Sequence, residues 1–517
     1  MRQVAIATAP PHERSRLRPY ARAARPLLAF VRRIPAAGRA CFLIAFLNAA
    51  IWGIVVPPFQ VPDEIAHFGY AQYLAETGSL PPQKVAPPYS DEEQLTLQDL
   101  EFFNVIGRPE LRGILDKAED KALRAALATH PSPVGPGGQT SITDQPPLYY
   151  ALEAIPYRLS PSSNILTRLV FMRLLSALLA AGTVLAVFMF LRELFPGTPW
   201  SWTVGALVVA FQPMFDFIAA GVQGDNLLFL ASATTLFLLL RAYRRGFTRR
   251  RAVAIGVATA VGLLAKLTFI ALVPGIGIAL LLLTWRELSR GHGEALRSLA
   301  VTVLTVAVPY AIYALLNIYV WHRGGPTAGG IGAATNSALP SGTHVTLNET
   351  LDYIWELYLP PLWFMHHRYF GHYPGWEIWL NGSIGHFGWL DYTFPAWVYE
   401  YGLYIFYTLS ALAIVALIRL RDRLLGWLPM FACFGVMGAG LLGSIGYTGI
   451  RYQLTTGSQF AQARYLFPMI AFWGALVVLA ALGVGRRWAP VMGGVLVVAA
   501  MALGLFAETL TISRYYG

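Results

Sequence analysis

Residues 37–67 read AGRACFLIAFLNAAIWGIVVPPFQVPDEIAH, an apolar run that ends at two prolines and is followed by an acidic pair. A helix needs about 20 apolar residues to cross roughly 30 Å of hydrocarbon, so residues 37–57 predict a transmembrane helix. A cleaved signal peptide is the alternative, but no small-residue cleavage pattern follows the run, and we interpret it as a retained first span. The stretch therefore indicates a membrane protein with carboxylates just beyond its first helix.

The composition of the whole chain supports the same interpretation. Of 517 residues, 56% are hydrophobic and only 13% are charged, and the mean hydropathy is +0.50. A soluble domain has about 25% charged residues, so a soluble globular enzyme is excluded. Cys41 and Cys433 both lie in apolar runs. This excludes a disulfide framework and a cysteine metal site.

The other apolar runs predict an all-α polytopic membrane protein, a bundle of eleven transmembrane helices. The stretch 252–285 offers 34 residues for two crossings, so each of its helices is expected to be short or partly re-entrant. The predicted helices are 37–57, 168–192, 201–221, 226–242, 252–266, 268–285, 298–320, 400–418, 425–446, 465–484 and 488–508.

Arginine-rich segments set the predicted orientation. The first 40 residues contain nine arginines against one acid, Glu13, and residues 241–251 contain six arginines and no acid. Three further turns, 286–297, 419–423 and 486–487, carry arginines that fall on the same side. Because such loops stay cytoplasmic, we expect a multi-pass membrane protein with its N-terminus inside and its C-terminus outside. The net charge of +11 is then explained by contact with anionic lipid, without nucleic acid.

Two long loops fall on the outer side. Residues 59–165 contain 14 acids against seven Lys and Arg. Within this first loop, DEIAHFGYAQYLAET predicts an amphipathic helix ending at Gly78, residues 91–128 predict two more helical stretches, and 129–147 should be irregular. The predicted organisation is a basic cytoplasmic tail at 1–36, a transmembrane module at 37–320 that includes the outer loop 59–165, an aromatic outer loop at 321–400, and C-terminal transmembrane helices at 401–517.

The sharpest chemical feature is the segment 61–67, VPDEIAH. Pro62 favours a helix start, so Asp63 and Glu64 are expected in the first helical turn, with His67 one turn on from Asp63 and on its face. This group is a candidate for acid–base chemistry at the bilayer surface. The alternative is that the acids satisfy the free N–H groups and the dipole of a helix N-terminus.

Two further acids lie where the chain turns on the outer side. Asp144 belongs to TDQPPLYY (143–150), which closes the first loop and in which two prolines fix the backbone. Asp225 belongs to the short turn Gly224–Asn226, within reach of the first loop if the bundle is compact. An ordinary loop-to-helix turn and a helix cap are the respective alternatives.

Three cations occupy unusual places in or beside the spans. They are Arg173 in FMRLLSALLAAG, Lys266 in GLLAKLTFIALVP and Arg464 in GSQFAQARYLFP. Charges within spans are costly and mark function or a paired partner. A lipid phosphate is the anion expected for them. Snorkelling, or pairing with Asp63 or Asp225, is the alternative.

The histidines show no consistent spacing for metal ligands. Six of them fall in the second outer loop, and His366 and His367 cannot both face one ion from a regular helix. We interpret these histidines as structural or as substrate contacts. The six are His322, His344, His366, His367, His372 and His386.

The order of these motifs resembles the GT-C superfamily of membrane glycosyltransferases, which includes protein O-mannosyltransferases and aminoarabinose transferases. The matching pieces are an Asp-Glu pair after the first span, DQPPLYY closing the first loop, MRLLSALLAAG in the second span, GDNLLFLAS opening the fourth and AKLTF after the fifth. A closer resemblance, through PDEIAHFGYAQYL, FGWLDYTFP and QARYLFP, is to a family of predicted bacterial membrane proteins without assigned function. The resemblance covers most of residues 40–480, and it implies a multi-pass protein of a bacterial inner (plasma) membrane.

The resemblance implies a GT-C-like bundle and a role for each matching residue. Asp63 matches the carboxylate taken as general base, with Glu64 and His67 as its neighbours in the catalytic group. Asp144 departs from the Glu-Lys-Pro or His-Pro-Pro of those transferases. The other positions are implied to contact the substrate, the cations through the donor's phosphate: Asp144, Asp225, Arg173, Lys266, Arg464, Tyr465 and Asp391.

These observations predict a glycosyltransferase that moves a sugar from a polyprenyl-phosphate-linked donor to a hydroxyl of a glycan, lipid or protein acceptor. Asp63 would take the acceptor's proton, and a divalent metal, Mg or Mn, could bridge Asp63 and another acid. One alternative is a polysaccharide polymerase or ligase using a lipid-linked glycan, with Arg368 or His386 essential. Another is a lipid or solute transporter, which predicts mid-span ionisable residues and discontinuous helices in matched halves.

Overall fold

The computed structural model describes residues 33–82, 88–111, 117–135, 140–323, 345–365 and 368–517. These residues form a helical bundle with one two-stranded sheet, which confirms the predicted all-α polytopic class. Within them, nine helices are long and apolar enough to cross a membrane, or ten if a bent pair forms one span. The predicted count of eleven is not confirmed. Residues 1–32 of the predicted tail 1–36 lie outside the described residues, as do His344, His366 and His367.

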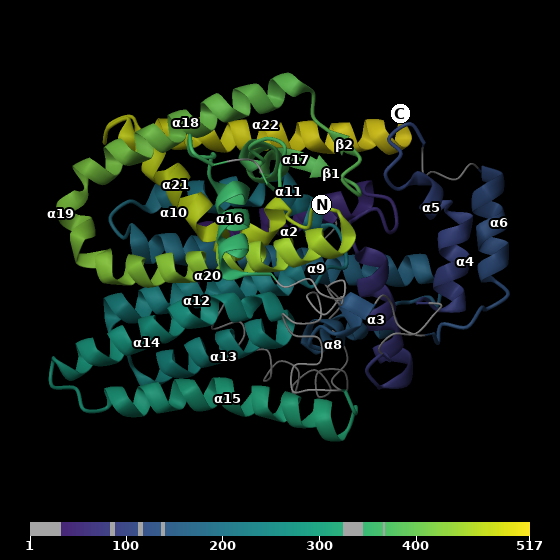
Figure 1. The fold of residues 1–517 in the computed structure, drawn as a ribbon, viewed down its shortest axis with the longest axis horizontal. Helices are drawn as coiled ribbons and strands as arrows, with labels where there is room; N and C mark the ends of the chain where they lie inside the picture. Colours follow the sequence, from purple (N-terminus) through teal and green to yellow (C-terminus); the bar gives the residue numbers. More distant parts are fainter. Residues whose placement is uncertain (1–32, 83–87, 112–116, 136–139, 324–344, 366–367) are drawn as a thin grey trace, which may run out of the picture.

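The elements divide into those of the bundle and those of the two outer loops (Figure 1). The bundle consists of α2 (Ala36–Val55), α9 (Ile165–Leu194), α10 (Pro199–Ala210), α11 (Pro213–Ala219), α12 (Asp225–Arg245), α13 (Arg249–Ala265), η1 (Leu267–Leu272), α14 (Val273–Leu288), α15 (Ala295–Tyr319), α18 (Ala396–Arg419), α19 (Arg421–Leu424), η3 (Leu425–Trp427), α20 (Leu428–Thr456), η4 (Ala463–Met469), α21 (Ile470–Gly483) and α22 (Ala489–Tyr516). The loops contain α3 (Glu64–Thr77), α4 (Asp91–Asp99), α5 (Phe102–Val105), α6 (Lys117–Leu127), α7 (Thr140–Thr143), α8 (Leu148–Leu159), α16 (Leu347–Tyr358), η2 (Gly375–Asn381), α17 (Gly382–Gly385), β1 (His386–Phe387) and β2 (Tyr392–Thr393).

Two of the predicted spans are not straight, full-length helices: one is bent and one is short. The sequence gives the physical reason for the bend. The span expected at 201–221 is the pair α10 and α11, bent by 63°. Gln212 precedes Pro213 and adopts extended backbone angles, as a residue before proline prefers, so the helix must restart. The span expected at 252–266 is α13, whose 17 residues measure about 25 Å at 1.5 Å per residue. The prediction of short helices in 252–285 therefore holds for α13.

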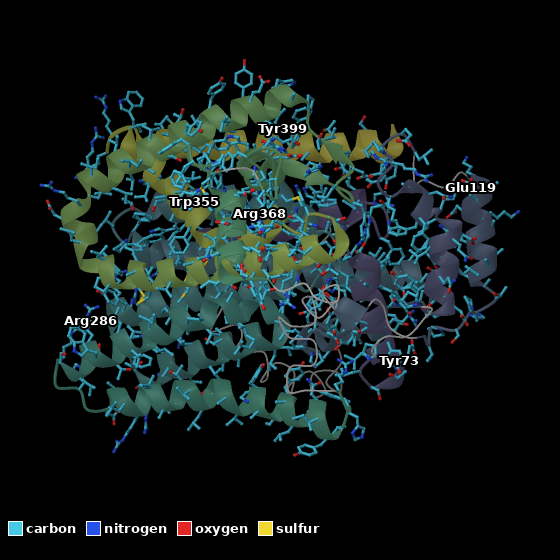
Figure 2. The ribbon with its side chains drawn as sticks, in the orientation of Figure 1. Tyr73, Glu119, Arg286, Trp355, Arg368 and Tyr399 are labelled. Carbon is cyan, nitrogen blue, oxygen red and sulfur yellow. The ribbon has the colours of Figure 1, made fainter. Side chains whose placement is uncertain are left out.

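The basic turns gather at one end of the bundle and the first outer loop at the other. Arg286 lies at the left end of Figure 2, whereas Tyr73 and Glu119 of the first loop lie at the right. At the left end, Arg286 donates to the carbonyl of Tyr243 and the Tyr243 hydroxyl donates to the carbonyl of Gly426. Arg419 likewise joins its turn to Gly483. All four basic turns thus share one side, as the predicted orientation requires.

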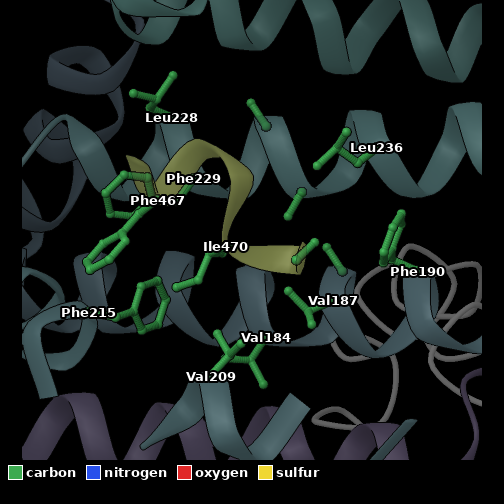
Figure 3. Close-up of a cluster of buried hydrophobic side chains, with 14 of the residues drawn as sticks. Val184, Val187, Phe190, Val209, Phe215, Leu228, Phe229, Leu236, Phe467 and Ile470 are labelled. Atoms are coloured by element: carbon green, nitrogen blue, oxygen red, sulfur yellow. The ribbon is translucent and has the colours of Figure 1, made fainter. Parts of the chain in front are cut away.

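The core lies where α9, α12 and the start of α21 meet (Figure 3). Phe215, Phe229 and Phe467 form a triangle of rings, with centroids 6.0 Å, 5.6 Å and 6.3 Å apart. Such aromatic pairs contribute about 0.5–1.5 kcal/mol each beyond the burial of their area. Because Phe229 follows Asp225 by one helical turn and Phe467 follows Arg464 by three residues, this packing brings those two charged residues together.

The first outer loop folds against the bundle through α3 and α8. The helix α3 ends at Gly78 as predicted, with left-handed backbone angles at that glycine. It is not amphipathic, because ten of its 14 residues are buried and they cover every face of the helix. The described parts of residues 91–128 contain three helices in place of two, α5 being a single turn. The hairpin of β1 and β2 and the end of α22 pack on the segment before Asp63: Trp389 donates to the carbonyl of Phe59 and Tyr515 to Gln60.

Candidate active site

Asp63 lies at the N-cap of α3, just after Pro62. The sequence placed it inside the first helical turn, but its φ of 63° is left-handed, a conformation that Asp adopts more readily than most residues. Its side chain makes no capping hydrogen bond, which removes the capping alternative for this residue. The carboxylate is instead 38% exposed and accepts a hydrogen bond from Arg464 Nη2 at 2.7 Å. The backbone turn therefore presents Asp63 to a cation and to open space.

Arg464 lies near the start of η4, and its side chain is only 3% exposed. Among the described residues, Nε and Nη1 of this guanidinium have no hydrogen-bond partner. Its plane lies over the ring of Tyr465, 5.5 Å from the centroid. A buried guanidinium with free donors is costly unless an anion occupies them. The free N–H groups therefore mark a place for oxygen atoms of a ligand.

Lys266 and Asp225 form a second buried ion pair, with Nζ and Oδ1 2.6 Å apart. Lys266 stands at the break between α13 and η1, where its extended backbone interrupts the helix. Asp225 is the first residue of α12. Gln145 of the DQPP segment accepts a hydrogen bond from the Leu267 N–H at 3.3 Å, so the end of the first loop closes over this break.

His67 joins the group from α3, one turn after Asp63. Its Nδ1 is 2.9 Å from the hydroxyl of Tyr150, and the two rings stack. The ring also lies against Gly224, where an added Cβ would be 3.5 Å from His67 Cε1. His67 is thus held between the end of the first loop and the turn that carries Asp225.

The electrostatics keep Asp63 charged and His67 neutral. Burial alone would raise the pKa of Asp63. The charge and hydrogen bond of Arg464, together with the charge of Lys266, outweigh burial, so the net pKa lies below the ordinary 3.8. Burial lowers the pKa of His67 to about 3, and the charge of Lys266 acts in the same direction. At neutral pH the site therefore contains a carboxylate and an uncharged imidazole.

Glu64 and Arg173 form a separate, fully buried pair. Arg173 donates to both oxygens of Glu64, at 2.8 and 2.6 Å, and to the carbonyls of Gly53, Val56 and Pro57. Glu64 also accepts from two backbone N–H groups, those of Phe59 and Val222. All five N–H donors of the guanidinium are used, so none remains for a phosphate. This geometry argues against the sequence-based roles of both residues, and we assign them to positioning the loop.

Asp144 and Asp391 lie outside the pairs around Asp63. Asp144 is 5% exposed, and the carbonyl of the preceding residue, Thr143, accepts a hydrogen bond from Arg323. Asp391 is buried in the turn between β1 and β2 and pairs with Arg514 at 3.3 Å. Arg514 also donates to carbonyls of the first loop. Asp391 therefore connects structural segments, and the geometry gives no support to its predicted contact with substrate.

Several residues at the site were given no role from the sequence. Tyr150 and Tyr149 were part of DQPPLYY, but only the structure brings Tyr150 onto His67. The ring of Tyr70 also stacks on Tyr150, at 3.6 Å between centroids. Gln223 donates to the carbonyl of Pro62 and so fixes the residue before Asp63. Its place beside Asp225 in GVQGDN was a signal that the sequence offered.

The residues present do not fit the divalent metal considered from the sequence. The carboxylates of Asp63 and Asp225 each already bind a side-chain cation. Within the described part of the chain, no group of three or more His, Cys, Asp or Glu is arranged to hold a metal ion.

Comparisons with known proteins place the chain in a family. Residues 46–473 match the family described as "Predicted membrane protein (DUF2142)", whereas no curated protein sequence matches. Among solved structures, ArnT from Cupriavidus metallidurans in the apo state has a TM-score of 0.49 and 12% identity, over 93% of this chain and 78% of that chain. The apo oligosaccharyltransferase of Archaeoglobus fulgidus has a TM-score of 0.43 and 12% identity, over 92% of this chain and 56% of that chain. The family match confirms the closer of the two resemblances drawn from the sequence, and the chain belongs to the DUF2142 family of predicted membrane proteins.

Proposed function

We propose that the protein is a membrane glycosyltransferase that takes a sugar from a polyprenyl-phosphate-linked donor and transfers it to a hydroxyl group at the outer face. The observation that carries the proposal is the pair of Asp63 and Arg464: an ionised, partly exposed carboxylate held against a buried guanidinium with free donors. A base and an oxyanion site side by side are what this reaction needs. The order of GT-C-like motifs in the sequence supports the same class.

The proposed reaction is a direct displacement at the anomeric carbon. The acceptor oxygen forms a bond to that carbon, its proton passes to the Asp63 carboxylate, and the bond from carbon to the phosphate oxygen breaks. The lipid phosphate leaves with the electron pair. Its negative charge grows in the transition state, where the free N–H groups of Arg464 and the ammonium of Lys266 would stabilise it.

Asp225 and His67 would act through their neighbours. Asp225 holds Lys266 at 2.6 Å and thereby fixes the direction of its remaining N–H donors. His67 is fixed by Tyr150, and as a neutral ring it can exchange a hydrogen bond with sugar hydroxyls. A membrane setting suits the donor, because its isoprenoid tail stays in lipid while the sugar reaches the loop end of the bundle.

The two alternatives gain less support from the described residues. Arg368, proposed for a polymerase or ligase, is 53% exposed and pairs with Glu349. For a transporter, the mid-span Arg173 is fully engaged by Glu64 and backbone carbonyls. Only one bent helix pair was found among the described residues, and matched halves would need two.

The test is an assay of purified protein with a panel of polyprenyl-phospho-sugars that differ in sugar and in one or two phosphates. We expect release of the polyprenyl phosphate from one donor class, dependent on an added acceptor extract and on Asp63. Sugar transfer that persists in Asp63→Asn but is lost in Arg368→Gln would favour the polymerase or ligase. Movement of the intact donor across vesicles, with no bond broken, would favour the transporter.

The protonation states of Asp63 and His67 should not change between pH 5 and 8, so neither residue should make turnover depend on pH in that range. The carboxylate is the active form and persists above a pKa lower than 3.8, and His67 is neutral above about pH 3. Protonation of Asp63 should therefore reduce kcat/KM only below about pH 4. A pH profile of kcat/KM measures this. An acid limb near 6.5, the ordinary pKa of histidine, would contradict the assignment.

Replacing Arg464 should lower kcat more than it weakens donor binding. Loss of an oxyanion donor typically costs about 10²–10³-fold in kcat, so we expect that range for Arg464→Gln and a smaller loss for Arg464→Lys, which keeps the charge but not the fork. Arg124→Gln is the matched control, since Arg124 is exposed and, among the described residues, forms an ion pair only with Asp120. Steady-state kinetics with varied donor concentration would separate the effect on kcat from the effect on KM. A rise in KM alone would show that Arg464 binds donor and transition state equally.

A further inference from the structure

A cavity of about 540 Å³ lies at the arginine-rich end of the bundle, between the turn from α12 to α13 and the start of α15. It is far from the candidate active site, because Asp225 opens α12 and the cavity residues end it, 21 residues or about 30 Å away. Four arginines and two glutamates are among its walls. The lining residues are Arg244, Arg245, Gly246, Phe247, Thr248, Arg249, Glu287, Arg290, His292, Glu294, Ala295 and Ser298.

The acids in and behind the cavity account for some of its cations but not for all of them. Glu193, 1% exposed, pairs with Arg244 and Arg245 at 3.0 Å. Glu287 pairs with Arg290 at 3.1 Å. No described residue forms an ion pair or hydrogen bond with the side chain of Arg249. The cavity therefore keeps a net positive charge with at least one uncompensated guanidinium.

The helix that starts beside the cavity also lacks its usual anion. The first turn of α13 contains three arginines, Arg249 to Arg251, and no acid, and Thr248 provides no side-chain cap. A helix N-terminus carries partial positive charge and favours acids, so three cations there are unfavourable on their own. Bound phosphate oxygens would satisfy the free N–H groups and the arginines together.

Ser298 gives an independent indication of a ligand. It lines the cavity and is only 1% exposed, yet its hydroxyl makes no hydrogen bond with any described residue. Polar groups this deeply buried are normally paired. Its hydroxyl can donate to an anion that the arginines hold.

Exposed apolar side chains within two residues of the lining residues Glu287 and Ala295 indicate where the ligand comes from. Trp285, 66% exposed, and Leu288 end α14, and Leu296, 57% exposed, belongs to the first turn of α15. Exposed Trp and Leu at a helix end are typical of the bilayer interface. We propose that this cavity binds the phosphate headgroup of an anionic phospholipid, with the acyl chains lying along Trp285 and Leu296. This site is independent of the proposed transferase function.

The experiment is native mass spectrometry of the purified full chain with added phosphatidylglycerol or phosphatidylcholine of matched chains. We expect the anionic lipid to be retained preferentially and Arg249→Gln to lower its occupancy at least fivefold, since one arginine near a lipid surface contributes about that factor. Arg250→Gln is the matched control: it removes the same charge from the same helical turn, but Arg250 does not line the cavity. Ser298→Ala should lower occupancy a few-fold without any change in charge.

Three results would overturn the proposal. Equal losses in Arg249→Gln and Arg250→Gln would show diffuse surface attraction in place of a built site. Equal retention of the two lipids would remove the role of headgroup charge. Displacement of the lipid by low millimolar inorganic phosphate would assign the cavity to free phosphate. Melting temperatures of the variants, measured in parallel, should match that of the wild type, so that a loss of binding is not a loss of fold.

Discussion

Asp63→Asn should lower turnover by about 10²–10⁴-fold, the usual contribution of a positioned general base. The amide cannot take the proton of the attacking hydroxyl, but its oxygen can still accept the hydrogen bond from Arg464 that the carboxylate accepts at 2.7 Å. The left-handed backbone at this position also tolerates Asn, so the fold should be retained. Binding of the donor should change little, because in the proposed reaction its phosphate contacts Arg464 and Lys266 and not Asp63.

The measurement compares single-turnover rates and donor affinity in wild type, Asp63→Asn and Asp91→Asn. Asp91 is an exposed acid in the first turn of α4 on the same loop, so its substitution controls for a general loss of negative charge. We expect full turnover in Asp91→Asn. Turnover of Asp63→Asn within a factor of about three of the wild type would remove Asp63 from the chemical step.

The general plan of the fold could be predicted because hydrophobic runs and arginine turns act locally. A run such as 37–57 must cross the membrane wherever the rest of the chain lies, and α2 occupies Ala36–Val55. The break at Gln212 was missed although Pro213 was visible, because an apolar run of this length predicts one straight span. The buried setting of α3 was missed for a different reason. Its polar side chains find tertiary hydrogen-bond partners: His67, for example, contacts Tyr150, which lies 83 residues later in the sequence.

The members of the site could be proposed from the sequence, but their pairings could not. Asp63 and Arg464 are 401 residues apart, and tertiary packing such as that of Phe229 against Phe467 brings Arg464 to the loop. Lys266 and Asp225 were both candidates, and pairing with Asp225 was one of the alternatives left open. Arg173 was assigned to a phosphate because nothing local showed that Glu64, 109 residues earlier, would use its donors. Long-range charge pairing of this kind depends on the tertiary fold.

Removing either partner of the Glu64–Arg173 pair should destabilise the protein by about 3–5 kcal/mol, because the remaining charge stays buried without a counter-ion. Glu64→Leu leaves the Arg173 guanidinium unpaired and two backbone N–H groups without an acceptor. Arg173→Leu leaves the carboxylate unpaired and frees three carbonyls at the end of α2. The double variant should lose less stability than the sum of the two single losses, since each substitution removes the charge that the other would leave unpaired.

Thermal or denaturant unfolding of the three variants in one detergent gives the coupling between the two side chains. At temperatures where the folded state persists, Glu64→Gln should lose far less turnover than Asp63→Asn, since Glu64 positions the loop and does not take the proton. This comparison separates two adjacent acids that the sequence alone treats alike. Additive losses of stability would show that the pair is not coupled. Equal losses of turnover in Glu64→Gln and Asp63→Asn, with both proteins folded, would return Glu64 to the catalytic group.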